Sequence, residues 1–188
     1  MVVAPHADPA ALAAILGAHP GRAKVFVTES VFSVDGDLAP LAELHAVTSA
    51  HDTLLLVDDA HAIGILGLST VPAASRRPTW LSLADVVVTA TLSKSLGGAG
   101  GVIADPAALI RHLVDTGRTF IYDTAPPPAV VAGVHAALRI TRAADDRRAV
   151  LADRGRADGP PARRRPVSQF RRRRRACCRC RLPAPRRR

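Results

Sequence analysis

Apolar residues follow two different periods along the first 144 residues. Short continuous runs rich in Val, Leu and Phe predict buried strands, and longer stretches with apolar residues every three or four positions predict helices. The predicted strands lie at residues 2–4, 24–28, 53–57, 86–88 and 101–104. The predicted helices lie at residues 10–17, from Pro40 onward, and at 106–117 and 129–144. This alternation is typical of βαβ crossovers, so we expect an α/β fold: a mostly parallel sheet with flanking helices.

The predicted strands end in polar clusters. The run 53–57 (T-L-L-L-V) is apolar without alternation, as expected for a strand whose two faces are both covered by helices. Polar clusters follow three strands, at residues 29–37, 58–61 and 91–94. Ligands in parallel sheets bind beyond the carboxyl ends of the strands. We therefore expect an active site where these clusters meet.

Lys94 is the last residue of the third cluster. The chain has only two lysines, Lys24 and Lys94, against 24 arginines. An amine can lose its proton when it is partly buried or near another cation, and it can then form a Schiff base, which a guanidinium cannot do. A solvated turn lysine is the ordinary alternative. The glycines follow Lys94, whereas those of a phosphate-binding loop precede the lysine, so the pattern does not predict such a loop.

Asp58 and His61 form a D-x-x-H pair directly after a predicted strand. Alone, Asp58 could cap the following turn, and a single histidine is more often structural. Two side chains without a third ligand do not make a metal site, so we expect none. With Lys94, however, the carboxylate could keep a pyridine nitrogen protonated, while the imidazole and nearby hydroxyls could bind a phenolic oxygen. These are the requirements of pyridoxal phosphate.

Four segments together resemble a known family, the α-oxoamine synthases, which are fold-type I pyridoxal phosphate enzymes. The segments are T-E-S-V-F-S-V-D-G-D-L-A-P-L (28–41), L-L-L-V-D-D-A-H-A-I-G-I-L-G (54–67), T-L-S-K-S-L-G (91–97) and F-I-Y-D-T-A-P-P (120–127). The resemblance covers roughly residues 1–144 and is nearest to the branch that serves biotin biosynthesis. Glycine C-acetyltransferase and 5-aminolevulinate synthase share versions of the same motifs.

The resemblance implies roles for six residues. The catalytic residues would be Lys94, which binds the cofactor and moves the substrate's α-proton, and His61. The cofactor-binding residues would be Ser33, Asp58, His61, Thr91, Lys94 and Thr124. Asp58 would pair with the pyridine nitrogen, and His61 and Ser33 would contact the phenolic oxygen. Thr91 would reach the phosphate, as would Thr124 from the partner subunit of a homodimer.

The implied reaction is a decarboxylative condensation of an amino acid, alanine in the nearest branch, with an acyl thioester such as pimeloyl-CoA or its carrier-protein form. Family members also have a segment before the position of Met1 and a small domain after that of residue 144. We therefore expect residues 1–144 to be part of the family's large domain, truncated at both ends, and the activity of this chain stays open.

Residues 145–188 differ from the rest in composition. They hold 17 of the arginines and a net charge of +13, whereas residues 1–144 have a net charge of −3. All three cysteines, Cys177, Cys178 and Cys180, also lie here, so the body has no disulfide framework, as in reducing compartments. The cysteines lack a fourth ligand for zinc. No apolar run approaches the roughly 18 residues that span a bilayer, so we expect a cytoplasmic protein.

We expect this Arg-rich tail to be disordered and interpret it as the product of a reading-frame shift near residues 145–150. The competing hypothesis is a non-catalytic basic protein whose tail binds nucleic acid through phosphates. The absence of tail aromatics other than Phe170 weakens that hypothesis.

Overall fold

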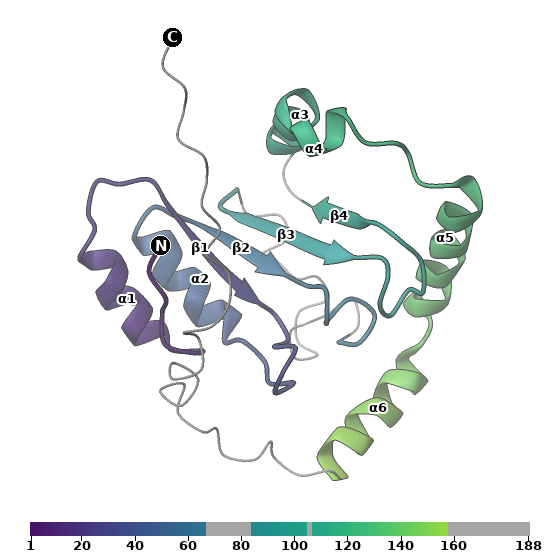
Figure 1. The fold of residues 1–188 in the computed structure, drawn as a ribbon. Coiled ribbons are helices and arrows are strands. Elements are labelled where there is room, and N and C mark those ends of the chain that lie inside the picture. The colour runs from purple at the N-terminus through teal and green to yellow at the C-terminus, as the bar shows by residue number, and fades with distance from the viewer. Residues whose placement is uncertain (67–83, 105–106, 158–188) are drawn as a thin grey trace, which may run out of the picture.

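The computed structural model of the chain describes residues 1–66, 84–104 and 107–157, and these form a mixed sheet with helices around it. The sheet has the strand order β1-β2-β3-β4 (Figure 1). The strands are β1 (Lys24–Glu29), β2 (Thr53–Asp58), β3 (Val86–Thr91) and β4 (Gly101–Ala104). The first three run parallel, and β4 runs antiparallel to β3. The predicted mostly parallel sheet is therefore confirmed.

Helices α1 (Pro9–Gly17) and α2 (Leu41–Ala50) cover one face of the sheet. Asp8 caps α1 by accepting a hydrogen bond from the N–H of Ala11 (2.9 Å), and Pro9 occupies the first turn, where its missing N–H costs nothing. Leucines from both helices form one buried cluster, and Phe26 of β1 packs against it and against the adjoining strand cluster. The buried members of the two clusters are Leu12, Leu16, Leu41, Leu44, Leu55, Val57 and Val86.

The opposite face of the sheet is more exposed. Burial alternates along β2, and on β1 the side chains of Val25 and Val27 are 58% and 62% exposed. The prediction that helices cover both faces of residues 53–57 is therefore wrong for the described part of the chain. An apolar run shows what a strand is able to bury, but it does not identify what covers it.

Four helices follow β4: α3 (Ala107–Thr116), α4 (Arg118–Ile121), α5 (Pro128–Arg142) and α6 (Asp145–Ala157). They lie beyond the β4 edge of the sheet, whereas α1 and α2 lie near β1 and β2 (Figure 1). Within residues 107–155, Val134 of α5 is the only buried residue. None of the helices in the described ranges is long and apolar enough to cross a membrane.

Two sequence predictions differ from the structure. Residues 2–4 form no strand, because none of the strands in the described ranges pairs with them, and Val2 and Val3 are exposed. The helical pattern was predicted to end at residue 144, whereas α6 begins at Asp145. Asp145 and Asp146 in its first turn interact favourably with the helix dipole, and the helix is rich in Ala and Arg, which are good helix formers. The prediction of a disordered tail beyond residue 157 lies outside the described residues, as does Gly67.

Candidate active site

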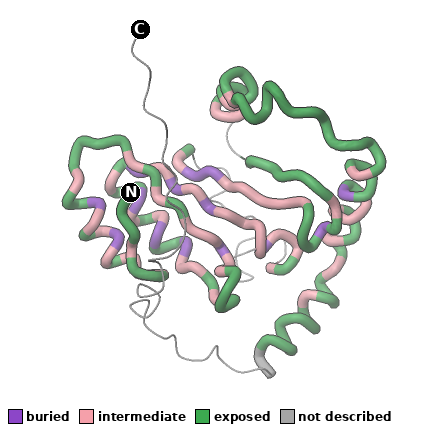
Figure 2. The backbone as a smooth tube through the Cα atoms, viewed as in Figure 1, coloured by how far each residue is buried: buried purple, intermediate pink, exposed green. Residues whose placement is uncertain are grey.

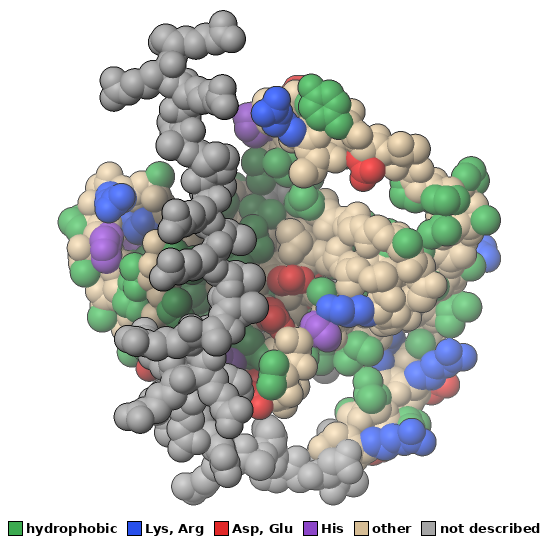
Figure 3. Space-filling view, in the orientation of Figure 1, with side chains coloured by type: hydrophobic (Ala, Val, Ile, Leu, Met, Phe, Trp, Pro, Cys, Tyr) green, Lys and Arg blue, Asp and Glu red, His purple; other side chains and the backbone are tan. Residues whose placement is uncertain are grey.

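The carboxyl ends of the three parallel strands bring the predicted polar clusters together. In the sheet register, Asp58 pairs with Glu29 on one side and with Thr89 on the other. Figure 3 shows acidic, histidine and basic side chains gathered in the region where these strands end in Figure 1. The predicted polar clusters therefore lie at one edge of the sheet.

Lys94 and His61 are in direct contact, although they lie 33 residues apart in the chain. The Lys94 Nζ atom is 2.8 Å from His61 Nε2. A protonated amine has no lone pair, so Lys94 in its ammonium form donates this hydrogen bond and the neutral imidazole accepts it at Nε2. The contact places an amine and a proton acceptor side by side, as proton transfer requires.

Both side chains extend from backbone that is anchored in the protein interior. Ala62, which follows His61, is fully buried, and Leu96, two residues after Lys94, is 5% exposed. Ser95, which follows Lys94, donates a hydrogen bond from its hydroxyl to the carbonyl of Ile63. This bond connects the turn that carries Lys94 to the turn that carries His61. The Lys94–His61 contact therefore rests on two connected turns.

The glycine cluster shapes the turn that carries Lys94. The N–H of Leu92 donates to the Gly100 carbonyl (2.9 Å), and the N–H of Gly98 donates back to the Leu92 carbonyl (2.8 Å). Gly97 donates to the Lys94 carbonyl (3.0 Å). Gly97 and Gly100 have φ angles of 63° and 98°, which residues other than glycine rarely adopt. The glycines thus form a tight β3–β4 connection with Lys94 near its tip.

Two hydroxyls lie beside Lys94. Thr91 Oγ1 is 2.7 Å from Ser93 Oγ, and it also accepts a hydrogen bond from the N–H of Ser93 (3.2 Å). Hydroxyl and backbone N–H groups next to an amine are suitable for binding an anion such as a phosphate. Thr91 was predicted from the sequence, whereas Ser93 was not, although its position next to Lys94 could have indicated it.

Asp58 occupies the turn directly after β2. Its Oδ1 atom accepts a hydrogen bond from the N–H of Ala60 (2.9 Å), so the carboxylate is held in place by its own turn. This is the turn-capping role that the sequence left open. A carboxylate can accept about four hydrogen bonds, and Asp58 therefore keeps the capacity to accept one from a ring N–H. The two roles are compatible.

Sequence reasoning missed the neighbouring pair formed by Ser30 and Asp59. Ser30 is 2% exposed and donates its hydroxyl to Asp59 Oδ1. Burial raises the pKa of the Asp59 carboxyl, the hydrogen bond from Ser30 offsets part of this rise, and the neighbouring charge of Asp58 adds to it. The available signal was weak: Ser30 and Asp59 each follow a strand by one residue.

Ser33 and Thr124 lie apart from these groups. Ser33 is exposed, and its N–H donates to Glu29 Oε2 (2.8 Å). Thr124 is also exposed, in the segment between α4 and α5, and its N–H donates to Asp123 Oδ1 (2.8 Å). Within the described residues neither makes a hydrogen bond to the other predicted site residues, so their roles in cofactor binding stay predictions.

The loop that contains Ser33 is fastened to the N-terminal segment. His6 Nε2 is 2.8 Å from Asp37 Oδ2, and the His6 ring lies 4.0 Å from the ring of Phe32, measured between centroids. The chain before α1 therefore holds the loop between β1 and α2 from the side.

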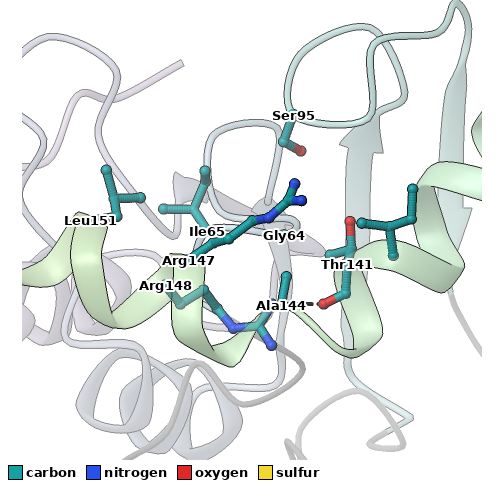
Figure 4. Close-up of a pocket in the computed structure, with 9 residues that line it drawn as sticks. Gly64, Ile65, Ser95, Thr141, Ala144, Arg147, Arg148 and Leu151 are labelled. Atoms are coloured by element: carbon teal, nitrogen blue, oxygen red, sulfur yellow. Dashed lines mark hydrogen bonds between the residues drawn. The ribbon is translucent and has the colours of Figure 1, made fainter.

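A separate cavity of about 250 Å³ lies between the turn after His61 and the helices α5 and α6 (Figure 4). Arg148 closes one side by donating to the Thr141 carbonyl (2.7 Å). The other lining residues are Gly64, Ile65, Ser95, Ile140, Ala144, Arg147 and Leu151. None of the six predicted site residues lines this cavity, so it is distinct from the Lys94 site.

No group of three His, Cys, Asp or Glu side chains in residues 1–66, 84–104 and 107–157 is arranged to hold a metal ion.

A lysine in contact with a histidine, at the edge of a mostly parallel sheet and beside a D-x-x-H turn, is consistent with the pyridoxal phosphate chemistry predicted from the sequence. The chain belongs to the aminotransferase class I and II family, which its residues 3–156 match. Within that family its relatives are α-oxoamine synthases, so the resemblance found from the sequence is confirmed.

The curated relatives cover most of this chain. The 8-amino-7-oxononanoate synthase of Mycolicibacterium smegmatis is 48% identical over 155 residues, which are 82% of this chain and 40% of that protein. The enzyme of the same name from Mycolicibacterium gilvum is 47% identical over 146 residues, which are 74% of this chain and 37% of that protein. The chain therefore spans about two fifths of the length of the relatives that it matches.

Solved structures show the same similarity. A serine palmitoyltransferase from S. paucimobilis with a bound PLP–myriocin aldimine superimposes with a TM-score of 0.69 and 30% identity, covering 80% of this chain and 39% of that one. An 8-amino-7-oxononanoate synthase from Francisella tularensis superimposes with a TM-score of 0.57 and 29% identity, covering 73% of this chain and 40% of that one.

Proposed function

We propose that this chain carries the lysine-bearing part of an 8-amino-7-oxononanoate synthase. Such an enzyme condenses L-alanine with a pimeloyl thioester, on CoA or a carrier protein, and releases carbon dioxide. The observation that carries the proposal is the 2.8 Å contact between Lys94 Nζ and His61 Nε2, next to the Asp58 turn. The 48% identity to a synthase of that name supports the choice of branch.

The described residues fit pyridoxal phosphate. Asp58 would accept the pyridine N–H, His61 and Ser33 would contact the phenolic oxygen, and Thr91 would bind the phosphate. Thr124 would bind the phosphate from the second subunit of a homodimer. When bound, the cofactor supplies an electron sink that stabilises the carbanion formed at the α-carbon of the amino acid.

The chain's own contribution is to hold and move protons. Lys94 would accept the proton from the α-carbon, which is general base catalysis by an amine. His61 would orient the amine through Nε2 and share its proton. The anchored backbone at Ala62 and Leu96 would keep the two nitrogen atoms close, since small misplacements of reacting groups are costly.

A related reaction is the second candidate. The superposition with serine palmitoyltransferase has the higher TM-score, 0.69 against 0.57, which favours a sibling reaction with another amino acid or acyl donor, such as that of glycine C-acetyltransferase. We prefer the first candidate because sequence identity to the named synthases reaches 48%, against 30% for the palmitoyltransferase. In either case we place the enzyme in the cytoplasm.

The test is cofactor binding to the amine of Lys94. Purified full chain is mixed with pyridoxal phosphate, its absorbance spectrum is recorded, and the adduct is fixed with borohydride and located by peptide mass mapping. We expect a visible absorbance band and a fixed adduct on Lys94, and loss of both in Lys94→Ala. Lys24 at the start of β1 is the chain's other lysine, so Lys24→Ala is a matched control that should keep the band.

An adduct that maps mainly to Lys24 or to the N-terminal amine would contradict the proposal. If Lys94 is labelled, titration with alanine, glycine and serine separates the two candidates. A spectral change that saturates at the lowest concentration with alanine supports the first candidate, and a preference for glycine or serine supports the second.

A further inference from the structure

The hydrogen bonds of Ser30 and Asp59 connect three strands directly beneath the site. The Ser30 N–H donates to the Asp58 carbonyl (3.0 Å), and its hydroxyl donates to Asp59 Oδ1. The N–H of Asp59 donates to the Thr89 carbonyl (2.7 Å). Ser30 follows β1, Asp59 follows β2 and Thr89 belongs to β3, so this set of bonds ties together the ends of the three parallel strands.

We propose that the hydrogen bond between the Ser30 and Asp59 side chains, called here the Ser30–Asp59 link, is a positioning device that fixes the direction of the Asp58 carboxylate and the place of His61. The inference rests on the proposed function, because it assigns a role toward the same cofactor site. Neither residue is among the six assigned to the cofactor.

The Ser30–Asp59 link gives the adjacent carboxylates of Asp58 and Asp59 different orientations. Asp58 and Asp59 are consecutive at a strand end, where successive side chains point in opposite directions. Ser30 holds Asp59 on the inner side, and this leaves Asp58 to cap its turn through the N–H of Ala60. Without the link, Asp59 could turn outward to relieve the cost of burying its charge. The turn of residues 58–61 would then lose its fixed conformation.

The same turn continues to His61. The Asp59 carbonyl accepts hydrogen bonds from the N–H groups of Ala62 and Ile63, both at 3.0 Å. Asp59 therefore contributes its side chain to Ser30, its N–H to Thr89 and its carbonyl to the residues just after His61. Asp59 is the direct neighbour of Asp58 and is separated from His61 by Ala60 alone, so a change in its orientation is transmitted to both through the backbone.

Three variants isolate the link. Ser30→Ala removes the hydroxyl donor and leaves the partly buried Asp59 carboxylate without this hydrogen bond. Asp59→Asn keeps an oxygen acceptor for Ser30 but removes the charge. Thr53→Ala is the matched control: Thr53 is as buried as Ser30, at 2%, and its hydroxyl donates one hydrogen bond, to the His51 carbonyl (3.1 Å), but it lies at the opposite end of β2.

The first readout needs no cofactor. Hydrogen exchange of the backbone amides of residues 59–63 is measured in the full chain and compared with exchange over β1. We expect Ser30→Ala to speed exchange at 59–63 by about tenfold, as when a buried acceptor loses its donor. Asp59→Asn should leave it near the wild-type rate, and Thr53→Ala should produce no selective change there. Equal effects of Ser30→Ala and Thr53→Ala at these amides would overturn the proposal.

The second readout uses pyridoxal phosphate. The pH midpoint of the Lys94-dependent absorbance band reports the interaction of Asp58 with the ring nitrogen, because a weaker interaction leaves less positive charge on the ring. We expect the midpoint to move to higher pH in Ser30→Ala, with weaker cofactor binding, and to stay in place in Thr53→Ala. An unchanged midpoint in a folded Ser30→Ala variant would also overturn the proposal.

Failure of the proposed function gives a different result. In that case the wild-type chain shows no Lys94-dependent band, while the exchange experiment still decides whether the link holds the Asp58–His61 turn.

Discussion

Two parts of the described chain are stabilised differently. Residues 1–66 and 84–104 hold every buried hydrophobic residue of the described part except Val134. Residues 107–157 form four helices, and the side chains of residues 107–155 are mostly exposed (Figure 2). The first part therefore has its own hydrophobic core, and the second depends on a few contacts with its surroundings.

The predicted site residues are divided between the same two parts of the chain. Lys94, His61, Asp58 and Thr91 all belong to the part with the core, and of the predicted site residues only Thr124 belongs to the other part. A catalytic geometry requires backbone that does not move, and a packed sheet provides it. The exposed helices can vary in position without disturbing the Lys94–His61 contact, and the following changes test this contrast.

The largest effect is expected in the core of the first part. Leu55 of β2 is 1% exposed and packs with Leu41, Val57 and Val86. Leu55→Ala should lower the free energy of unfolding by about 2–5 kcal/mol, because it removes buried methyl groups and leaves a cavity. Urea denaturation followed by circular dichroism measures the loss.

The control for this change is Val131→Ala in α5, where the side chain is 52% exposed. Its effect should stay within about 0.5 kcal/mol. Equal losses for the two variants would show that the helical part is as well packed as the sheet, contrary to the division described above.

An intermediate effect is expected where the two parts meet. A Cβ atom added at Gly98 would lie 2.2 Å from Val134 Cγ2, so Gly98→Ala should push α5 away from the Lys94 turn. We expect a cost of about 1–3 kcal/mol from overpacking. The double variant Gly98→Ala, Val134→Ala removes the clashing methyl group and should recover part of the loss.

Gly133→Ala in α5 provides the comparison, because a Cβ atom added at Gly133 meets no neighbouring atom within 4 Å. It should increase stability by up to about 1 kcal/mol through helix propensity. If the double variant is no more stable than Gly98→Ala alone, the clash with Val134 is not the cause of the loss.

The smallest effects concern charge and have opposite signs in two carboxyls of the first part. Burial is the main cause that raises the pKa of the Asp59 carboxyl above 3.8. The stability that this carboxyl contributes is therefore fully present below pH 3.8 and is lost as the pH rises through the raised pKa. Asp59→Asn should therefore be more stable than wild type at neutral pH. The difference should shrink on acidification in urea titrations at several pH values.

Asp85 behaves in the opposite way. Burial raises its pKa, but the hydrogen bond and charge of His45, 3.1 Å away, together with neighbouring hydrogen bonds, hold it below 3.8. The stability that the Asp85 carboxyl contributes is present above pH 3.8 and is lost as the pH falls through the lowered pKa. Asp85→Asn should be less stable than wild type at neutral pH, with a gap that closes in acid. Gaps of the same sign in the two variants would contradict this assignment.

The sequence was sufficient to predict most elements and the Lys94–His61–Asp58 grouping, for a physical reason. Hydrophobic periods reveal strands and helices, and the carboxyl ends of parallel strands meet at one edge whatever the details of packing. The residues 2–4 were mistaken for a strand because a strand requires a partner, which a local pattern does not reveal.

The Ser30–Asp59 link depends on information of another kind. Which of two consecutive carboxylates lies beside Ser30 depends on the register of β1 against β2, where Glu29 lies opposite Asp58. That register joins residues 29 positions apart and is set by the packing of Leu55 and Phe26 under α1 and α2. The extent of α6 was missed for a simpler reason: the arginine-rich composition hid a sequence of good helix formers.

The antiparallel pairing of β3 with β4 also has a kinetic consequence. The two strands pair Thr91 with Gly101 across a short turn, whereas β2 and β3 pair residues such as Leu55 and Val86, 31 positions apart. Hairpins close within microseconds, and parallel pairing must wait for distant segments to meet. The Lys94 turn should therefore form early in folding, and the active site is completed only when β2 docks and brings His61 to a lysine that is already in place.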